Sequence, residues 1–332
     1  MMSFGVETAV TLCLTVLIIA TNVLILLMLF TTDMLALFNK HFFVSLTLAD
    51  LGVGLFVTPF SVWTTVFERW IYGDRFCHVE AYIAAVLYIA SVQSLAWLSV
   101  DQYVALRKPD RHASIMTSTR SGCWVALVWT TAVGFCLSPL FGRSTARYYA
   151  EAYVCVVDWS SQTAYFVTAA VLLIVPSLVA LAFANVYIFT ATYERDKTVY
   201  DRSAFEPAPA AVSDAGPGPV LVMIESTRPE LYAVNVIVGW VYVVVWLPWC
   251  ILQLYCYVTV STHSVASTER LDTTDMTASG SSTVAPVSAA LHFWLTWLAI
   301  ANSFWKFIVY VICFHDFRTG LKILYNNYIA CR

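Results

Sequence analysis

The chain has 332 residues, of which 60% are hydrophobic and only 12% are charged, and its formal net charge is −3. Soluble domains average about 25% charged residues, so this composition excludes an ordinary water-soluble enzyme or binding module and indicates a membrane protein. The nearly balanced charge supplies no basic surface for phosphates, and no nucleic-acid partner is expected.

Seven stretches are apolar enough to cross a bilayer as helices, which requires about 20 residues each. They cover residues 9–30, 42–67, 79–106, 122–142, 159–193, 231–260 and 284–313. The first is too long for a signal peptide and lacks both a basic leader and a small-residue cleavage pattern, so we expect a mature helix. The predicted fold class is an all-α membrane protein, a single seven-transmembrane helix bundle over residues 1–332.

Lysines and arginines set the orientation, because cytoplasmic loops hold the excess of these residues. Placing the N-terminus outside puts the larger group inside, including Lys40, Arg107, Lys108, Lys197 and Lys322. We therefore predict a multi-pass protein of the plasma membrane with an extracellular N-terminus and a cytoplasmic C-terminus.

Two cysteines stand apart from the rest, which lie mostly inside the apolar stretches and are expected to pack as small apolar residues. On this topology Cys77 and Cys155 both lie at the outer face, in an oxidising environment. We expect a disulfide between them, which ties the top of the third helix to the second outer loop.

The segments between and after the spans are polar or amphipathic. Residues 194–230 include "EPAPAAVSDAGPGP", which predicts a disordered inner linker. Residues 261–283 are expected to form a polar outer loop. Residues 314–325 alternate apolar and charged positions, which predicts a short amphipathic helix on the inner membrane lipid, followed by Cys331 as a weak palmitoylation candidate.

Several short motifs follow one another in a fixed order through these spans. They are Asn22, "LTLAD" ending at Asp50, "WIYGDRFC" with Trp70, Gly73 and Cys77, Trp129 with Pro139, Pro176, and "WLPW" from Trp246. In this order the chain resembles a rhodopsin-like (class A) G-protein-coupled receptor over nearly its whole length. The resemblance implies a heterotrimeric G-protein partner at the inner face, no cofactor and no enzymatic activity.

The inner end of the third helix departs from the family, which has Asp-Arg-Tyr where this chain has Asp101, Gln102 and Tyr103. Glutamine retains hydrogen bonding but loses a permanent charge and a five-donor fork, which puts the strength of coupling in question. The fifth helix departs as well, with Ala184 at the usual tyrosine position. By the resemblance, the residues facing the G protein are Asp101, Gln102, Tyr103, Tyr310 and Arg318. Alternatively, the inner basic residues are only determinants of topology.

The stretch "ANSFWKFIVY" aligns with the family's Asn-Pro-x-x-Tyr, so that Lys306 and Phe307 replace Asn and Pro and Tyr310 is retained. In the family this region faces a polar pocket that often holds sodium. An intramembrane charge costs about 2.5–3.5 kcal/mol on insertion scales and normally finds a partner. We predict that the Lys306 ammonium takes the place of sodium and pairs with Asp50, in a pocket formed by Asp50, Ser91, Asn302, Ser303 and Lys306.

Two other interpretations of Lys306 exist. Its amine can extend along the helix to lipid phosphates at the inner interface. It also raises the possibility of an opsin, in which a lysine binds retinal about ten residues before the final tyrosine. Lys306 precedes Tyr310 by four residues, and Ile300 stands at the retinal position, so an opsin is not favoured.

The ligand cavity is placed by the family alignment. The position of the amine-binding aspartate holds Ala84, so biogenic amines lose their anchor, and Glu80 one turn above is a weaker substitute. The cavity is expected to be aromatic and mostly uncharged, suited to an apolar or amphipathic ligand. Its predicted lining is Tyr88, Thr168, Trp246, Trp249, Gln253, Phe293 and Thr296. Alternatively, these aromatic residues are simply helix-packing residues, with Trp246 as the exception.

Short strings point to one branch of the family. "TAYF" at 163–166, "WLAIANSF" and "FRTGLKIL" look similar to a small pair of vertebrate orphan receptors. That resemblance implies stimulatory coupling, basal activity and a second outer loop that acts as a built-in ligand. Two alternatives remain: a signalling-poor or decoy receptor with altered activation motifs, and, more remotely, a seven-helix transporter.

Overall fold

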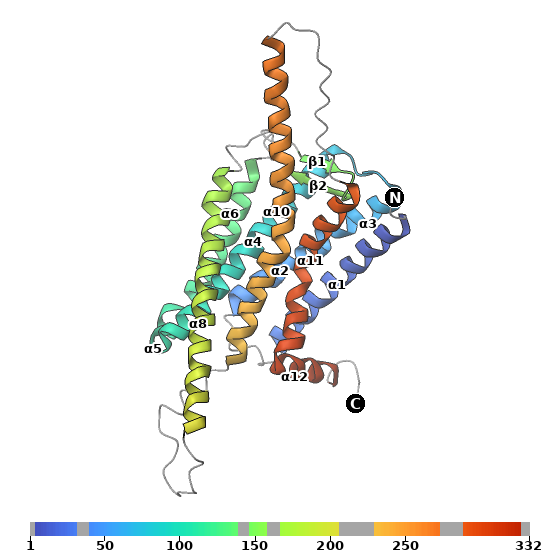
Figure 1. The fold of residues 1–332 in the computed structure, drawn as a ribbon. Coiled ribbons are helices and arrows are strands. Elements are labelled where there is room, and N and C mark those ends of the chain that lie inside the picture. Colours follow the sequence, from blue (N-terminus) through green and yellow to red (C-terminus); the bar gives the residue numbers. More distant parts are fainter. Residues whose placement is uncertain are drawn as a thin grey trace, which may run out of the picture.

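The computed structural model describes residues 4–31, 40–138, 146–157, 167–205, 229–272 and 288–326. These residues form a bundle of long helices with one small hairpin at one end (Figure 1). The N-terminus lies near the hairpin, and the short helices α5 (Pro109–Ile115) and α12 (His315–Leu324) lie at the opposite end. We call the hairpin end the outer end and the opposite end the inner end.

The first two predicted spans become three helices, α1 (Phe4–Thr31), α2 (Lys40–Phe56) and α3 (Thr58–Phe67). The predicted span 42–67 is interrupted at Val57, whose φ of −122° and ψ of −62° leave the helical region. Pro59 follows at the start of α3. Because proline lacks an N–H and restricts the residue before it, the helix ends and restarts there.

Helix α4 (Asp74–Arg107) is the centre of the bundle and packs against α2, α6, α8 and the hairpin. Helix α6 (Ser118–Ser138) lies beside it. The indole rings of Trp97 and Trp124 stack with centroids 4.3 Å apart, and the Trp129 indole N–H donates to the Ser45 hydroxyl at 3.1 Å. One aromatic and one polar contact thus fix α6 against α4 and α2.

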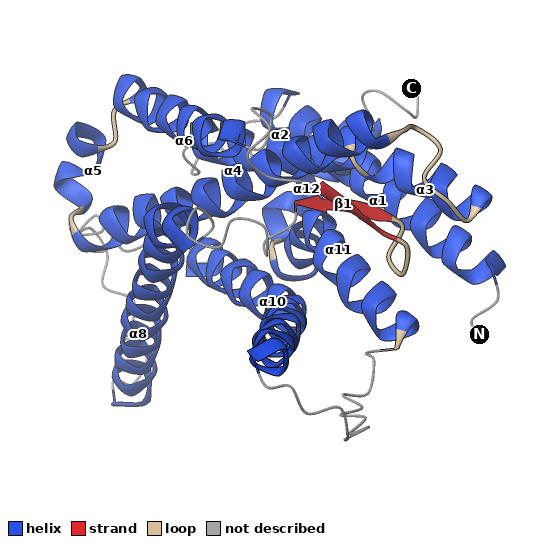
Figure 2. Cartoon of the chain, turned by 90° about the horizontal axis from the view of Figure 1, so that it is seen from above, coloured by secondary structure: helices blue, strands red, loops and turns tan. Residues whose placement is uncertain are grey.

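The hairpin consists of β1 (Ala146–Tyr149) and β2 (Val154–Val157), paired antiparallel so that Ala146 lies opposite Val157 and Tyr148 opposite Cys155. It lies across the outer end of the bundle, as the view along the helices shows (Figure 2). The sequence predicted a second outer loop here but not its two paired strands.

The fifth spanning unit begins at Val167, passes through a π-helical turn, η3 (Ala170–Ile174), and continues as α8 (Val175–Phe205). The Val175 N–H donates to the Ala170 carbonyl, five residues back. Pro176 comes next and has no N–H with which to continue the usual four-residue ladder. Proline therefore accounts for the wider turn, a local device that is common at functional sites.

The last spanning helices are α10 (Pro229–Asp272) and α11 (Ala289–Cys313). Ser288 caps α11 by accepting the Leu291 N–H at 3.2 Å, a favoured N-cap arrangement. Pro248 lies inside α10. The backbone of α10 comes so close to α8 at Gly239 that an added Cβ atom would stand 2.0 Å from the Asn185 side-chain nitrogen.

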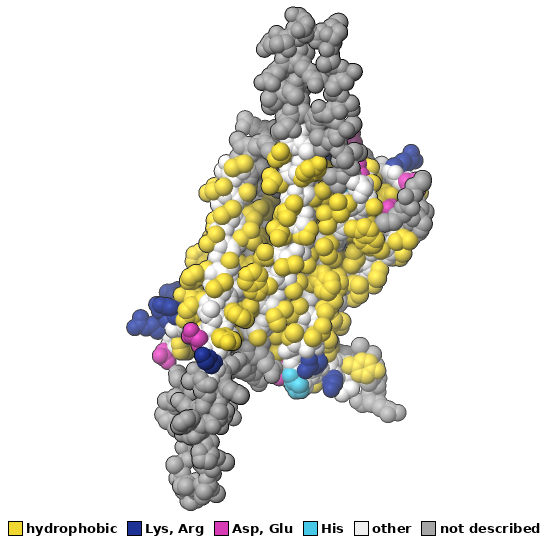
Figure 3. Space-filling model, in the orientation of Figure 1, with side chains coloured by type: hydrophobic (Ala, Val, Ile, Leu, Met, Phe, Trp, Pro, Cys, Tyr) yellow, Lys and Arg dark blue, Asp and Glu magenta, His cyan; other side chains and the backbone are white. Residues whose placement is uncertain are grey.

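The surface of the bundle matches a bilayer. Six described helical units are long and apolar enough to cross a bilayer. Helix α6 is the seventh unit of the bundle. In chain order the units are α1, α2 with α3, α4, α6, η3 with α8, α10 and α11. Large apolar side chains such as Val179, Phe183 and Leu254 are more than 60% exposed, which only lipid contact makes favourable. Charged side chains gather near the two ends, outside a continuous apolar band (Figure 3).

Several helix ends differ from the predicted limits. Helix α8 continues to Phe205 and α10 to Asp272, into segments we expected to be an inner linker and an outer loop. Neither extension contains proline or glycine, so nothing in the chain stops the helix there. Helix α12 lies within the predicted amphipathic segment 314–325. The strings at 163–166 and 206–219, the start of the seventh span, Pro139 and Cys331 lie outside the described residues.

Candidate functional site

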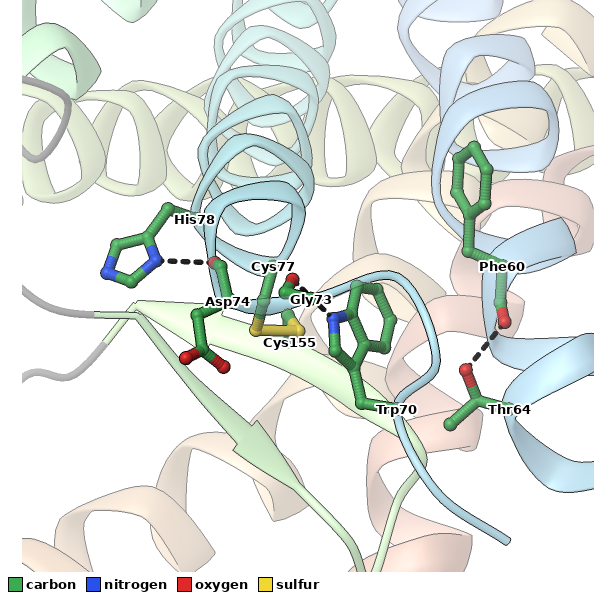
Figure 4. Close-up of a disulfide and its surroundings, with 8 residues drawn as sticks. All are labelled: Phe60, Thr64, Trp70, Gly73, Asp74, Cys77, His78 and Cys155. Atoms are coloured by element: carbon green, nitrogen blue, oxygen red, sulfur yellow. Dashed lines mark hydrogen bonds between the residues drawn. A yellow bond between two sulfur atoms is a disulfide. The ribbon is translucent and has the colours of Figure 1, made fainter. Parts of the chain in front are cut away.

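A disulfide fixes the hairpin to the outer end of α4, as the sequence predicted. Cys77 and Cys155 are bonded and both are buried, with Cα atoms 5.5 Å apart. The loop before α4 is held beside it, because the Trp70 indole N–H donates to the Gly73 carbonyl at 2.8 Å (Figure 4). Gly73 has a φ of 81°, a left-handed conformation that favours glycine.

The hairpin turn enters the bundle between α1 and α11. Ala152 is only 2% exposed, and its carbonyl accepts the Trp297 indole N–H at 3.0 Å. Tyr153 adopts a φ of 56°, its ring meets Phe293 edge to face at 6.3 Å, and its hydroxyl donates to the Glu7 carboxylate at 2.8 Å. A non-glycine residue in this conformation is uncommon and persists only where surrounding contacts hold it.

This environment raises the pKa values of two hairpin tyrosines. Burial and the nearby Glu151 raise the pKa of Tyr148 to about 12. Burial, followed by the hydrogen bond to Glu7, also raises the pKa of Tyr153. Both hydroxyls therefore keep their protons at physiological pH, and Tyr153 remains a donor to Glu7.

A cavity of about 120 Å³ lies beneath β2, enclosed by α4, α6, η3, α10 and α11. The predicted lining residues Tyr88, Trp246, Trp249 and Thr296 do line it, whereas Thr168, Gln253 and Phe293 do not. Thr168 is exposed, and Phe293 is fully buried against Trp297 and the hairpin. Residues 154–157 of β2 form its roof, and small side chains such as Ala81, Ala84, Ala169 and Ala170 complete its wall.

The rings around the cavity form a connected series. Tyr88 meets Trp246 edge to face at 5.1 Å, and Trp246 meets Trp249 in the same way at 5.4 Å. Such pairs contribute about 0.5–1.5 kcal/mol beyond the burial of their area. Typical small-molecule sites have volumes of about 300–1,000 Å³, so the cavity left under the hairpin is small.

Glu80 is an unusual residue of this outer half. It lies on α4 beneath the hairpin and is 1% exposed. The Cys155 backbone amide acts on its carboxyl, but within the described ranges neither carboxyl oxygen meets a partner in hydrogen-bond geometry. It does not line the cavity, so the structure gives no support to Glu80 as the anchor for a ligand held there.

A second group of polar residues lies deeper, where α2, α4 and α11 meet. The Lys306 ammonium donates to the Asp50 carboxylate, and both side chains are buried. The Ser91 hydroxyl donates to the same carboxylate at 3.0 Å, and Ser303 also interacts with it. Asn302 lines the adjoining cavity of about 10 Å³. The two charges predicted to pair are therefore in contact, and Lys306 does not extend to the interface.

Two residues of this region were not identified from the sequence. Tyr242 lines the small cavity with Asp50 and Lys306 and interacts with Ser91; its spacing, one turn before Trp246, was the available signal. Asn22, noted only as a motif residue, donates to the Ser303 carbonyl at 2.9 Å and joins α1 to α11.

The inner end brings together part of the predicted signalling residues. Tyr103 packs edge to face on Tyr187 at 4.8 Å. Tyr310 packs instead on Phe43 and Phe317, within 5.5 Å of each ring centre. Arg318 donates to the Val311 and Ile312 carbonyls, and so fastens α12 to the end of α11.

Asp101 and Gln102 lie side by side on α4 and are buried. Among the described residues the Gln102 amide has no hydrogen-bond partner. Asp101 is contacted by His112 of α5, with Nε2 3.0 Å from Oδ1. His112 was not a predicted site residue, because its contact depends on how α5 folds back and no local motif marks it.

Comparisons with known proteins agree with this arrangement. The model of the 7 transmembrane receptor (rhodopsin family) matches residues 21–313. The chain is 28% identical to the G-protein coupled receptor 52 of Bos taurus over 327 residues, 96% of this chain and 80% of that protein. It is 35% identical to the Octopamine receptor Oamb of Drosophila melanogaster over 127 residues, 38% of this chain and 20% of that one.

The fold is also similar to that of a solved receptor. The crystal structure of squid rhodopsin superposes with a TM-score of 0.72 at 14% sequence identity, covering 99% of this chain and 88% of that chain. The motifs, the bundle and the match of the family model along most of the chain lead to one conclusion: the chain belongs to the rhodopsin family of seven transmembrane receptors.

Proposed function

We propose that this receptor stands in the plasma membrane with its N-terminus outside and signals, without a diffusible agonist, to a G protein of the stimulatory class. Its family makes it a multi-pass membrane receptor that signals through heterotrimeric G proteins and not an enzyme, and leaves the transporter interpretation without support. The orientation follows from the inner lysines and arginines, and similarity to G-protein coupled receptor 52 over 96% of this chain and 80% of that protein supports the receptor branch.

The observation that carries the proposal is the burial of the hairpin turn. Ala152 lies within the outer end of the bundle and its carbonyl is hydrogen-bonded to Trp297 of α11. Helix α11 also carries Thr296, which lines the cavity, and Lys306, which meets Asp50. A segment of the chain's own outer loop thus contacts the helix that links the two sites, as a bound agonist would.

The remaining cavity suits a small apolar or amphipathic molecule. Its wall is formed largely by alanines and aromatic rings, with Thr296 as one of the few polar groups. Trp246 lies at its floor, in contact with Tyr88 and Trp249. A molecule bound here would act on the same rings as the hairpin, and would modulate the signal instead of starting it.

A second candidate function is that of a signalling-poor or decoy receptor. Two observations favour it: Gln102 replaces the family's arginine and its amide is unpartnered within the described part of the chain, and Lys306 pairs with Asp50 in the polar pocket. Both changes alter groups that the family uses in activation.

Basal cyclic AMP in cells expressing the chain separates the two functions. We expect high output from the unmodified receptor and a clear reduction in Trp297→Phe, which removes the indole N–H that meets Ala152. Trp63→Phe is the matched control, because Trp63 is 56% exposed on α3. A silent receptor at normal surface levels that is activated by Gln102→Arg or Lys306→Asn would establish the decoy function instead.

The polar pocket has its own test. We propose that the Lys306 ammonium replaces sodium beside Asp50; the adjoining cavity of about 10 Å³ has room for about one water. The melting temperature of the purified receptor should then be indifferent to exchange of sodium for potassium. In Lys306→Asn, sodium should raise the melting temperature. An indifferent Lys306→Asn variant would contradict this role.

A further inference from the structure

At the outer end of the bundle, α10 and α11 bring a free thiol and an imidazole together. Cys256, the last residue of the apolar part of α10, is a free cysteine. Its Sγ lies 3.6 Å from Nε2 of His292, near the start of α11 and 36 positions further along the chain. The two helices pack side by side (Figure 1). Neither residue lines the cavity beneath β2 or the small cavity beside Asp50, so the pair belongs to neither site described above.

The separation of the two atoms is the one that a shared metal ion requires. Zn²⁺ binds cysteine sulfur at about 2.3 Å and histidine nitrogen at about 2.0–2.1 Å, in tetrahedral geometry, which places the two ligand atoms about 3.6 Å apart. Cys256 Sγ and His292 Nε2 have this separation. The same distance suits a hydrogen bond between thiol and imidazole, which holds the two side chains together in the absence of an ion. Binding therefore requires no movement of either helix.

The surroundings of the pair hold the imidazole in place and favour a cation. His292 is 9% exposed, and the Tyr149 ring at the end of β1 lies 6.4 Å from the imidazole ring. The Glu151 side chain is exposed in the hairpin turn and acts electrostatically on Cys256. A negative charge beside the pair attracts a divalent cation. Because Cys256 is partly exposed, an ion can reach its sulfur from the medium.

The pair supplies two protein ligands. Within the described ranges, no group of three or more His, Cys, Asp or Glu side chains is arranged to hold a metal ion. Closed structural zinc sites take four protein ligands, whereas a site with fewer keeps water on the ion. We therefore expect an open site, which binds its ion more weakly than a structural site and exchanges it with the medium.

We propose that Cys256 and His292 bind a zinc ion from the outer medium, and that this ion joins α10 to α11. On binding, the thiol releases its proton to water, and the thiolate sulfur and the neutral imidazole Nε2 each donate an electron pair to Zn²⁺. Water completes the coordination. The ion stabilises the arrangement in which the two atoms are 3.6 Å apart. Glu151 strengthens binding by its charge and is not a ligand.

Thermal melting of the purified full-length receptor tests the site. After metals are removed with a chelator, saturating zinc should raise the melting temperature by roughly 2 °C or more. Cys256→Ser and His292→Gln, each compared with its own metal-free form, should lose this rise. Two variants are matched controls and should keep it: Cys250→Ser, at an exposed free cysteine of the same helix, and His78→Gln, at the outer end of α4. A wild type indifferent to zinc, or a rise that persists in Cys256→Ser or His292→Gln, would overturn the proposal.

Cobalt gives a second measure that does not depend on the stability of a variant. Co²⁺ accepts the same nitrogen and sulfur ligands, and a thiolate bound to it produces a charge-transfer absorption band in the near ultraviolet. The wild type should show this band, and excess zinc should remove it by displacing cobalt. Cys256→Ser should lack the band and Cys250→Ser should retain it. Its absence from the wild type, or its presence in Cys256→Ser, would overturn the assignment of the sulfur ligand.

The charge of Glu151 is tested separately. Glu151→Gln keeps the size of the side chain and removes its charge, so the zinc concentration for half-maximal effect should rise about two- to threefold, as expected for one nearby charge in water. An unchanged concentration would overturn the electrostatic role of Glu151. All of these readouts measure binding and require no signalling, so this inference and the proposed function fail separately.

Discussion

The outer and inner halves of this receptor are held by different forces. At the outer end, the hairpin turn packs among aromatic rings, and two hydrogen bonds, from Trp297 and Tyr153, fix it there. In the inner half, two buried carboxylates each meet a basic side chain: Asp50 pairs with the buried Lys306, and Asp101 meets the partly exposed His112. Both of these pairs involve positions at or next to departures from the family's motifs.

The difference predicts which half of the chain tolerates substitutions better. Apolar packing is distributed over many contacts, so a single substitution removes only part of it. A buried ion pair is concentrated, because loss of one partner leaves the other uncompensated in a medium of low polarity. Substitutions in the inner half should therefore cost more per side chain, and this expectation can be tested.

The largest effect is expected for Lys306→Met. It leaves the Asp50 carboxylate buried without its cation and should lower the free energy of unfolding by about 3–5 kcal/mol. Thermal melting of the purified receptor measures it. The double variant Lys306→Met with Asp50→Asn should recover most of the loss. A double variant as unstable as the single one would mean that the pair is not the reason for the cost.

The next effect concerns the covalent link at the outer end. Replacing Cys77 and Cys155 together by serine should lower stability by about 2–5 kcal/mol, the range for native disulfides, and free the hairpin. Melting temperature and surface expression report the loss. Cys250→Ser is the control, because Cys250 is a free, exposed cysteine. If the disulfide-free receptor kept its melting temperature, the packing of the turn alone would hold the outer end.

A gain in stability is expected at Glu80, a buried carboxyl among the apolar contacts of the outer half. Glu80→Met replaces a buried carboxyl with an apolar side chain of similar length; among the described residues the carboxyl oxygens meet no partner in hydrogen-bond geometry, although the Cys155 amide acts on them. The melting temperature should rise, corresponding to about 1–3 kcal/mol. Glu151→Met, at an exposed position of the hairpin turn, should change stability by less than about 0.5 kcal/mol. A destabilised Glu80→Met variant would show that the interaction of the carboxyl with the Cys155 amide, or with a partner outside the described residues, outweighs the cost of its burial.

The smallest effect is expected for Tyr153→Phe. It removes the hydrogen bond to Glu7 and keeps the ring contact with Phe293, so the loss should be about 0.5–1.5 kcal/mol. Tyr153→Ala removes both contacts and should cost more. The two melting curves together separate the polar contribution of this residue from the aromatic one, and equal losses would mean that the ring contact contributes nothing.

Much of this arrangement can be predicted from the chain, for identifiable reasons. Hydrophobic length indicates the spanning units, and the outer location of Cys77 and Cys155 predicts their bond. The contact of Lys306 with Asp50 follows from the cost of an intramembrane charge, which leaves few possible partners. These features depend on strong constraints that a lipid environment imposes on single residues.

Other features depend on how distant segments meet. The break at Val57 had a local signal in Pro59, but the continuation of α10 to Asp272 reflects only the absence of a stop signal. The contact of His112 with Asp101 requires the fold of α5. Phe293 was expected in the cavity and packs against the hairpin instead, because no pattern in the chain shows where the second outer loop enters the bundle.

The hairpin turn has a consequence for any molecule that approaches from outside. Because the chain and the disulfide hold Ala152 at the mouth of the bundle, the turn acts as a competitor at a high effective concentration, about millimolar for short tethers, and dilution cannot remove it. A soluble compound aimed at the same place must displace this attached segment. A compound that fits the cavity beneath β2 does not compete with the attached turn, so its binding depends on its own affinity for the cavity.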